Sequence, residues 1–139
     1  MIALSPKFPV AWLALGNVYL DQGRYDEAIA AHENLAHMPY FAFALGQTYA
    51  WAGQPEKALE VAQGYEQESR KEITLAVIYA ALGDVEKTLY WSAQAREKKL
   101  PWSLGLFSYF TATRSLHEDP RIRAEAAQYP TPLVPYPKG

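Results

Sequence analysis

Side chains able to do acid–base, nucleophilic or metal chemistry are present in this sequence, but they do not follow a recognised spacing. His32, His37 and His117 are not spaced to bind one metal ion. The eight glycines are single and scattered, so they form no glycine-rich phosphate loop. Serines and threonines lack histidine and aspartate at the positions of known nucleophile motifs. We therefore expect no catalytic residues, no cofactor and no metal ligands, and a chain that is not an enzyme.

The composition limits the kinds of partner and of cellular compartment that we expect. The chain has no cysteine, which excludes disulfides and thiolate metal sites and fits a reducing compartment. Its formal net charge is -2, and the densest basic runs, 96–99 and 121–123, are expected to be solvated charges at helix ends. This pattern does not favour a nucleic-acid partner, because nucleic-acid binding surfaces are strongly basic.

Neither a membrane span nor a secretion signal is expected. No apolar run approaches the ~18 residues that a membrane helix requires. Residues 1–7 lack a basic segment followed by an apolar stretch. We therefore expect a cytoplasmic protein with no membrane partner.

Four columns of residues recur along the chain at a step of 30. They are Tyr19, Tyr49 and Tyr79; Gly23, Gly53 and Gly83; Leu15, Leu45 and Leu75; and Gly16, Gly46 and Ala76. A fixed period in this range is typical of stacked-repeat proteins.

Each repeat is predicted to contain two helices separated by a glycine turn. Apolar residues at helical spacing predict first helices at 11–20, 40–51 and 71–81. Second helices are predicted at 25–36, from Pro55 onward, and at 85–97, and glycine at each turn supplies the left-handed backbone of a helix end. The predicted fold class is all-α, an α-solenoid of stacked antiparallel helix pairs.

We expect six segments along the chain. They are 1–8, the end of a preceding repeat or a cap; 9–38, 39–68 and 69–99, three repeat units; 100–128, C-terminal capping helices; and 129–139, a proline-rich tail. Within the capping region, helices are expected at about 103–110 and 122–128.

The first unit carries a motif that identifies a family. Trp12-x2-Leu15-Gly16-x2-Tyr19, followed by Gly23, Tyr25 and Ala28, resembles the tetratricopeptide repeat (TPR) at nearly every signature position. The later units depart from it at the tryptophan position, which holds Ala42 and Glu72. His32, Ala62 and Ser92 replace the usual aromatic residue of the second helix, where His32 is expected to be a core histidine rather than a ligand. The C-terminal segment resembles the end of TPR arrays in bacterial signalling proteins.

The resemblance implies a concave groove lined by the first helix of each pair. By register, the groove positions expected to contact a partner are Leu13, Asn17, Tyr40, Phe43, Gln47, Trp51, Arg70, Ile73 and Val77. Leu13 and Ile73 stand where some TPR domains carry the cations that bind a carboxylate, so that activity is not expected. The resemblance implies a non-catalytic scaffold that holds an extended apolar segment of a protein or peptide partner, with Asn17 and Gln47 orienting its backbone.

The C-terminal tail leaves two alternatives open. Residues 129–137 contain four prolines, which exclude a helix and favour an extended chain. The tail is either a loose terminus or strap along its own last helix, or the occupant of a groove. A groove of its own chain would give self-inhibition, and a neighbour's groove would give a homodimer. The alternative function is therefore structural self-association as a homodimer, with either the proline-rich tail or the apolar face as the contact between copies.

Overall fold

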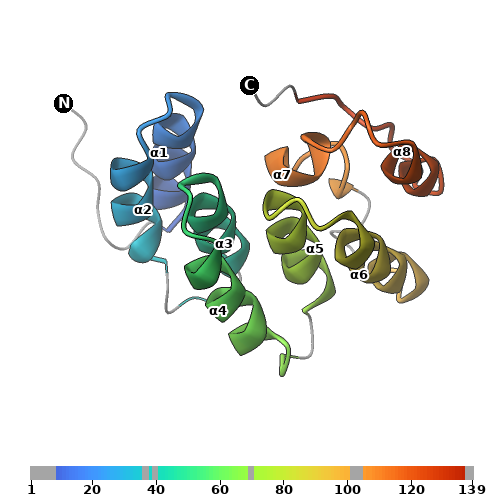
Figure 1. Cartoon of the computed structure of the whole chain (residues 1–139), viewed down its shortest axis with the longest axis horizontal. Coiled ribbons are helices and arrows are strands. Elements are labelled where there is room, and N and C mark those ends of the chain that lie inside the picture. The colour runs from blue at the N-terminus through green and yellow to red at the C-terminus, as the bar shows by residue number, and fades with distance from the viewer. Residues whose placement is uncertain (1–8, 36–37, 39–40, 69–70, 101–104, 137–139) are drawn as a thin grey trace.

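The computed structural model describes residues 9–35, 38, 41–68, 71–100 and 105–136 of the chain. These residues form eight α-helices (Figure 1). They are α1 (Pro9–Asp21), α2 (Tyr25–Glu33), α3 (Ala42–Trp51), α4 (Pro55–Tyr65), α5 (Glu72–Ala81), α6 (Val85–Glu97), α7 (Thr111–Arg114) and α8 (Pro120–Ala126). The all-α fold class predicted from the sequence is confirmed.

Identical turns join the two helices of each of the first three pairs. Gly23, Gly53 and Gly83 have φ of 74°, 82° and 78°, a backbone conformation that glycine adopts without steric cost. The residue after each glycine donates its backbone N–H to the carbonyl of the repeated tyrosine at 2.9 Å, in the pairs Arg24 to Tyr19, Gln54 to Tyr49 and Asp84 to Tyr79. The 30-residue step therefore repeats a turn geometry as well as a residue pattern.

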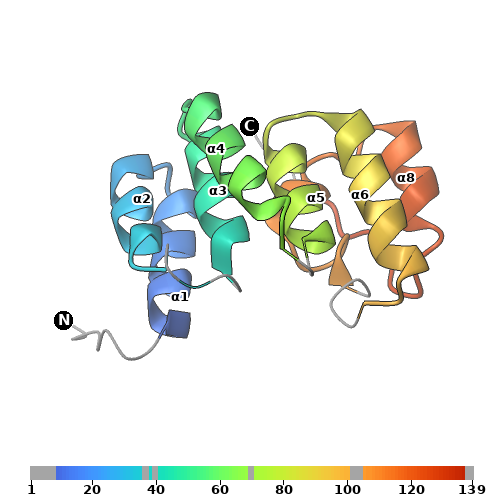
Figure 2. The same cartoon turned by 90° about the horizontal axis from the view of Figure 1, so that it is seen from below.

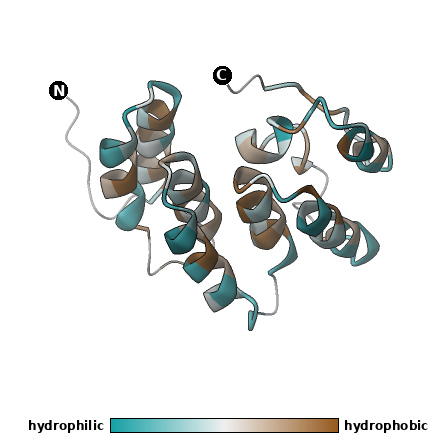
Figure 3. Cartoon of the chain, viewed as in Figure 1, coloured by the Kyte–Doolittle hydropathy of each residue, from teal (hydrophilic) through white to brown (hydrophobic). Residues whose placement is uncertain are grey.

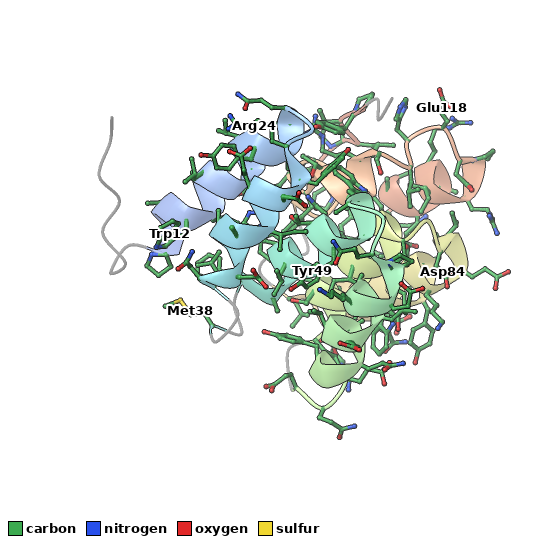
Figure 4. The ribbon with its side chains drawn as sticks, turned by 60° about the vertical axis from the view of Figure 1, so that its left-hand side comes forward. Trp12, Arg24, Met38, Tyr49, Asp84 and Glu118 are labelled. Carbon is green, nitrogen blue, oxygen red and sulfur yellow. The ribbon has the colours of Figure 1, made fainter. Side chains whose placement is uncertain are left out.

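The helix pairs stack in sequence order. α2 and α3 are in contact, and α5 contacts both α3 and α4. Figure 2 shows α1, α3 and α5 along one side of the stack and α2 and α4 along the other. Trp12 and Met38 lie at one end of the first pair, and the turn that carries Arg24 lies at the other (Figure 4). The predicted solenoid of antiparallel pairs is confirmed.

Small residues allow helices to approach closely, both within a pair and between neighbouring pairs. A Cβ atom on Gly16 would lie 2.1 Å from Nε2 of His32, and one on Gly46 would lie 2.6 Å from Cγ1 of Ile78. Ala58 is fully buried on the second helix of its pair. The small residues of the repeat columns are therefore used as close-contact positions.

The largest core cluster lies at the C-terminal end of the stack. It joins α5 to α8 and to the segment around Leu106, Phe107 and Phe110. Figure 3 shows hydrophobic residues concentrated on α5 and hydrophilic residues on the outer turns of α6 and α8. The C-terminal region thus packs directly on the third repeat.

Two predictions about the C-terminal half need correction. The described part of the predicted 103–110 helix, residues 105–110, does not form an α-helix: it consists mainly of turns and ends in extended backbone at Phe110, with φ of -80° and ψ of 124°. The basic run 96–99 is not simply solvated. Arg96 pairs with Glu125 of α8 at 3.1 Å, and Lys98 pairs with buried Glu72 of α5.

The structure does not cover every segment for which the sequence made a prediction. The segment 1–8, expected to be the end of a repeat or a cap, lies outside the described residues. None of the helices in the described ranges is long and apolar enough to cross a membrane.

Candidate binding site on the inner face

The first helices of the three pairs each present a stripe of residues at i, i+4 spacing, which places the members of a stripe on one helix face. We call the surface formed by these stripes the inner face. Its members are Leu13, Asn17 and Asp21 on α1; Phe43, Gln47 and Trp51 on α3; and Ile73, Val77 and Ala81 on α5. All sequence-predicted groove residues within the described ranges lie in these stripes. Tyr40 and Arg70 lie outside the described residues.

The α5 part of the inner face is covered by the chain's own C-terminal region. Val77 is fully buried and belongs to the cluster that contains Phe107 and Phe110, and Ile73 packs against the same cluster. Phe43 of α3 meets Phe110 edge to face, with ring centroids 5.0 Å apart. These three predicted contact positions are therefore occupied by intramolecular contacts.

Hydrogen bonds hold the segment that covers α5, residues 105–129, in place; we call this segment the cover. The Thr113 hydroxyl is bonded to the carbonyls of Leu106 and Phe110, the latter at 3.0 Å. Tyr129 meets the ring of Phe107 edge to face at 5.3 Å and donates its hydroxyl hydrogen to the Ser92 carbonyl at 2.7 Å. Burial raises the pKa of Tyr129 well above its usual range, so the hydroxyl remains a donor at neutral pH. The cover is consequently a packed part of the fold.

Beyond α8 the tail returns across α7 without regular secondary structure (Figure 1). The Val134 N–H donates to the Phe107 carbonyl at 3.1 Å. Arg114 donates from Nε to the Val134 carbonyl at 2.8 Å and from Nη2 to the Pro135 carbonyl at 3.2 Å. The described end of the tail, at Tyr136, lies over the inner face.

Tyr136 connects the tail to α1 and α3. Its ring stacks on Trp51 with centroids 6.1 Å apart and an interplanar angle of 14°, and the Arg114 guanidinium lies 5.2 Å from the ring centroid. The hydroxyl donates to the Asp21 carboxylate at 2.7 Å. Burial, together with that hydrogen bond, raises the pKa of Tyr136 to about 12. Asp21, Trp51 and Arg114 thus form a site around one tyrosine side chain.

The α1 part of the inner face is more open. Val10 at its start is 67% exposed, and Asn17 is exposed with no side-chain hydrogen bond to other described residues. Leu13, in contrast, is buried against Leu35 and Ala44, between the first and second pairs. Gln47 of α3 is also buried. Of the predicted groove residues that the structure describes, Asn17 alone is exposed.

His32 lies away from the inner face and inside the first repeat. Its Nε2 lies 3.4 Å from the Leu13 carbonyl, which only accepts, so Nδ1 accepts from the Thr48 hydroxyl at 2.8 Å. Burial lowers the pKa of His32, although hydrogen bonds to the Leu13 and Ala44 backbone act in the opposite direction. The prediction of a core histidine is confirmed. Within the described ranges no three His, Asp or Glu residues are grouped to hold a metal ion.

A shallow hollow of about 610 Å³ lies between α8 and the tail, outside the inner face. Its wall includes Tyr129, Pro132 and Leu133. The Arg123 guanidinium at its edge already donates to the carbonyls of His117 and Glu118. The hollow therefore presents mainly proline and apolar surface, and the inner face is the better candidate site.

The sequence predicted that Trp51 lies on the groove side but did not single out Arg114. Nothing in the local sequence marks this arginine, because the carbonyls it binds lie 20 and 21 residues further along the chain and come close to it only after the chain turns back. Its hydrogen-bond acceptors in the tail are main-chain oxygens, which leave no trace in residue types.

Helix pairs at a constant step, with glycine turns and a face lined by the first helices, define a repeat protein of the helical-solenoid class. A family model described as tetratricopeptide repeat matches residues 11–39. The first helix pair is thus similar to a tetratricopeptide repeat, and such repeats generally mediate contacts between proteins. No curated protein and no solved structure matches the chain.

Proposed function

We propose that this protein is a non-catalytic scaffold that holds an extended, apolar segment of a protein partner on the inner face. One observation carries the proposal: the inner face already holds a stretch of polypeptide, residues 134–136, through stacking, side-chain and backbone contacts. A surface that binds its own tail in this way has the chemistry to bind a foreign segment of similar character.

The exposure of the inner face supports a partner position along α1 and the end of α3. The α5 part is filled by aromatic residues of the C-terminal region, so a partner binds mainly along α1 and the end of α3. The Asn17 amide there makes no hydrogen bond to another described residue, and its donor and acceptor atoms suit a partner's backbone N–H and carbonyl groups. Val10, in the first turn of α1, supplies exposed apolar surface.

Self-association is the alternative function. A second copy presents the same tail, and its tyrosine offers the same ring and hydroxyl to Asp21 and Trp51 as the chain's own Tyr136 does. The tail reaches these residues as a segment without regular secondary structure, a form that exchanges readily between copies. The mass of the full chain in solution separates the two functions, because exchange of tails requires a dimer.

Selection of a random peptide display library against the full chain tests the scaffold proposal. We expect apolar, aromatic-containing peptides whose binding shifts the amide signals of α1 and α3. Asn17→Ala should weaken the selected peptides about threefold to tenfold, the value of one ordinary hydrogen bond.

Gln63→Ala is the matched control, because Gln63 is an exposed amide on α4, a second helix. It should leave peptide affinity unchanged. Peptides whose signals map to α2 and α4, or an Asn17→Ala variant that binds as well as the wild type, would contradict the proposal.

A further inference from the structure

The contacts of Tyr136 are made by three side chains that come from different parts of the chain. Asp21 ends α1, Trp51 ends α3 and Arg114 ends α7. Each addresses a different feature of the tail: Asp21 the hydroxyl, Trp51 the ring, and Arg114 both the ring and two carbonyls. Such convergence on one side chain and its preceding backbone is the arrangement of a recognition site.

We propose that Asp21, Trp51 and Arg114 form a docking site for a proline–tyrosine segment of a partner protein, and that the chain's own Tyr136 is a built-in competitor for it. The inference deepens the proposed function and rests on it: it names the chemistry of the segment that the inner face binds and the element that regulates access.

The side-chain contacts define why tyrosine is the preferred residue. The aromatic ring is needed for stacking on Trp51 and for the cation–π contact with Arg114. The hydroxyl is needed because Asp21 is an acceptor only, and phenylalanine would leave its carboxylate without that donor. Tyrosine alone among the standard residues supplies both a ring and a hydroxyl of this length.

The backbone contacts define why proline precedes the tyrosine. Arg114 binds the carbonyls of Val134 and Pro135, and the Tyr136 N–H donates back to the Arg114 carbonyl at 3.3 Å. Pro135 has no N–H and therefore leaves no unpaired donor at its position. Proline also holds the segment extended before binding, which lowers the entropy that binding must remove. The ligand class is thus an extended aliphatic–Pro–Tyr segment.

Occupation of this site by the chain's own tail raises the affinity that a partner segment needs in order to bind. A tethered segment acts at an effective concentration of about millimolar, so a free segment of equal intrinsic affinity competes poorly. A partner gains access either by making additional contacts on the open α1 stripe, next to Asp21, or when Tyr136 is withdrawn. The same contacts therefore keep the site closed to weak, non-specific segments.

Anisotropy of a fluorescent peptide with the sequence Pro-Thr-Pro-Leu-Val-Pro-Tyr-Pro tests the inference on the full chain. Tyr136→Ala should bind this peptide at least about tenfold more tightly than the wild type, because the competitor is removed and the rest of the chain is retained. A peptide with phenylalanine in place of tyrosine should bind Tyr136→Ala about tenfold more weakly, since the bond to Asp21 is lost.

Second variants locate the site. Adding Asp21→Ala to Tyr136→Ala should remove the preference for tyrosine over phenylalanine, whereas adding Glu60→Ala, an exposed acid on α4, should leave it unchanged. Equal peptide affinity for wild type and Tyr136→Ala, equal affinity of the two peptides, or no binding up to about 1 mM peptide would each overturn the inference.

Two further outcomes separate this inference from the scaffold proposal. Library peptides that bind α1 and α3 but lack tyrosine, together with failure of the tail peptide, would overturn the tyrosine site and leave the scaffold function intact. A wild-type dimer that Tyr136→Ala converts to a monomer would overturn the built-in competitor and make a second copy the occupant.

Discussion

α1 and α5 hold the same place in their repeats and share the same residue columns, yet they differ sharply in burial. Nine of the ten α5 residues are buried, whereas in α1 only Leu13, Gly16 and Leu20 are. The cause lies outside the repeat itself. α5 contacts α3, α4, α6 and α7, while α1 packs chiefly on α2. The same motif therefore builds a core helix at one end of the stack and a helix with an exposed face at the other.

The comparison separates two uses of one repeat. At α5 the inner face packs against the C-terminal region of the chain, and its apolar residues stabilise the fold. At α1 the equivalent face carries exposed Asn17 and the Asp21 carboxylate that Tyr136 reaches. The position of a residue in the repeat therefore predicts the helix face on which its side chain lies. It does not predict the exposure of that side chain, which depends on the segments that pack against the face.

The largest effect is expected from removing the cover of α5. Phe107 is 1% exposed in the cluster that buries Val77, so Phe107→Ala should lower the free energy of unfolding by about 3–5 kcal/mol. Tyr109, two residues later, is 62% exposed, and Tyr109→Ala should cost under about 1 kcal/mol. Urea denaturation measures both. Similar small losses for the two variants would mean that the C-terminal region does not pack on α5.

A smaller effect is expected inside the first repeat. The methyl group of Gly16→Ala would overlap the His32 ring, so this substitution should destabilise by about 1–3 kcal/mol despite the better helix propensity of alanine. Gly64→Ala on α4 meets nothing within 4 Å and should stabilise by about 0.5–1 kcal/mol. Thermal unfolding shows whether each substitution raises or lowers the stability of the protein. A stabilising Gly16→Ala would show that α1 and α2 are packed more loosely than the structure has them.

Acid should loosen the first repeat before the third. The pKa of His32 is lowered by burial, so below about pH 6.5 the unfolded chain binds a proton that the folded chain resists. The free energy of unfolding should therefore fall as pH drops through this range, and His32→Gln should flatten the dependence. Amide exchange of α1 and α2 should accelerate more than that of α5. Equal acceleration of all three helices would contradict the assignment to His32.

The smallest effect on global stability is expected at the tail. Tyr136→Phe keeps the stacking on Trp51 and loses only the bond to Asp21, so it should lower the free energy of unfolding by about 0.5–1.5 kcal/mol. Its local effect should be larger, with faster exchange of the Val134 and Tyr136 amides and little change in α5. An unchanged exchange rate at those two amides would show that the hydroxyl does not hold the tail.

Much of this fold could be predicted from the sequence, because glycine turns, helix periods and repeat columns are local signals. The helix pairs and the buried role of His32 follow from them. The turns at 105–110 could not be predicted, since Leu106, Phe107 and Phe110 fit a helical pattern and only their packing on α5 selects turns. The burial of Val77 has the same origin.

The tyrosine site was foreseen only in outline. The proline content of the tail suggested that it occupies a groove or lies along the last helix, but the sequence does not choose between them. Asp21 and Tyr136 are 115 residues apart, and their contact depends on the stacking of all three pairs. Residue types alone carry no information about such a distance.

Nuclear Overhauser effects between the Tyr136 ring and the Trp51 indole test most directly that the inner face holds the chain's own tail. The account predicts these effects in uniformly labelled wild-type protein and their persistence in a filtered experiment that retains only contacts within one chain. They should disappear in Tyr136→Ala, while the signals of α5 stay in place. Their absence from the wild type, or their appearance only between differently labelled copies, would contradict the account.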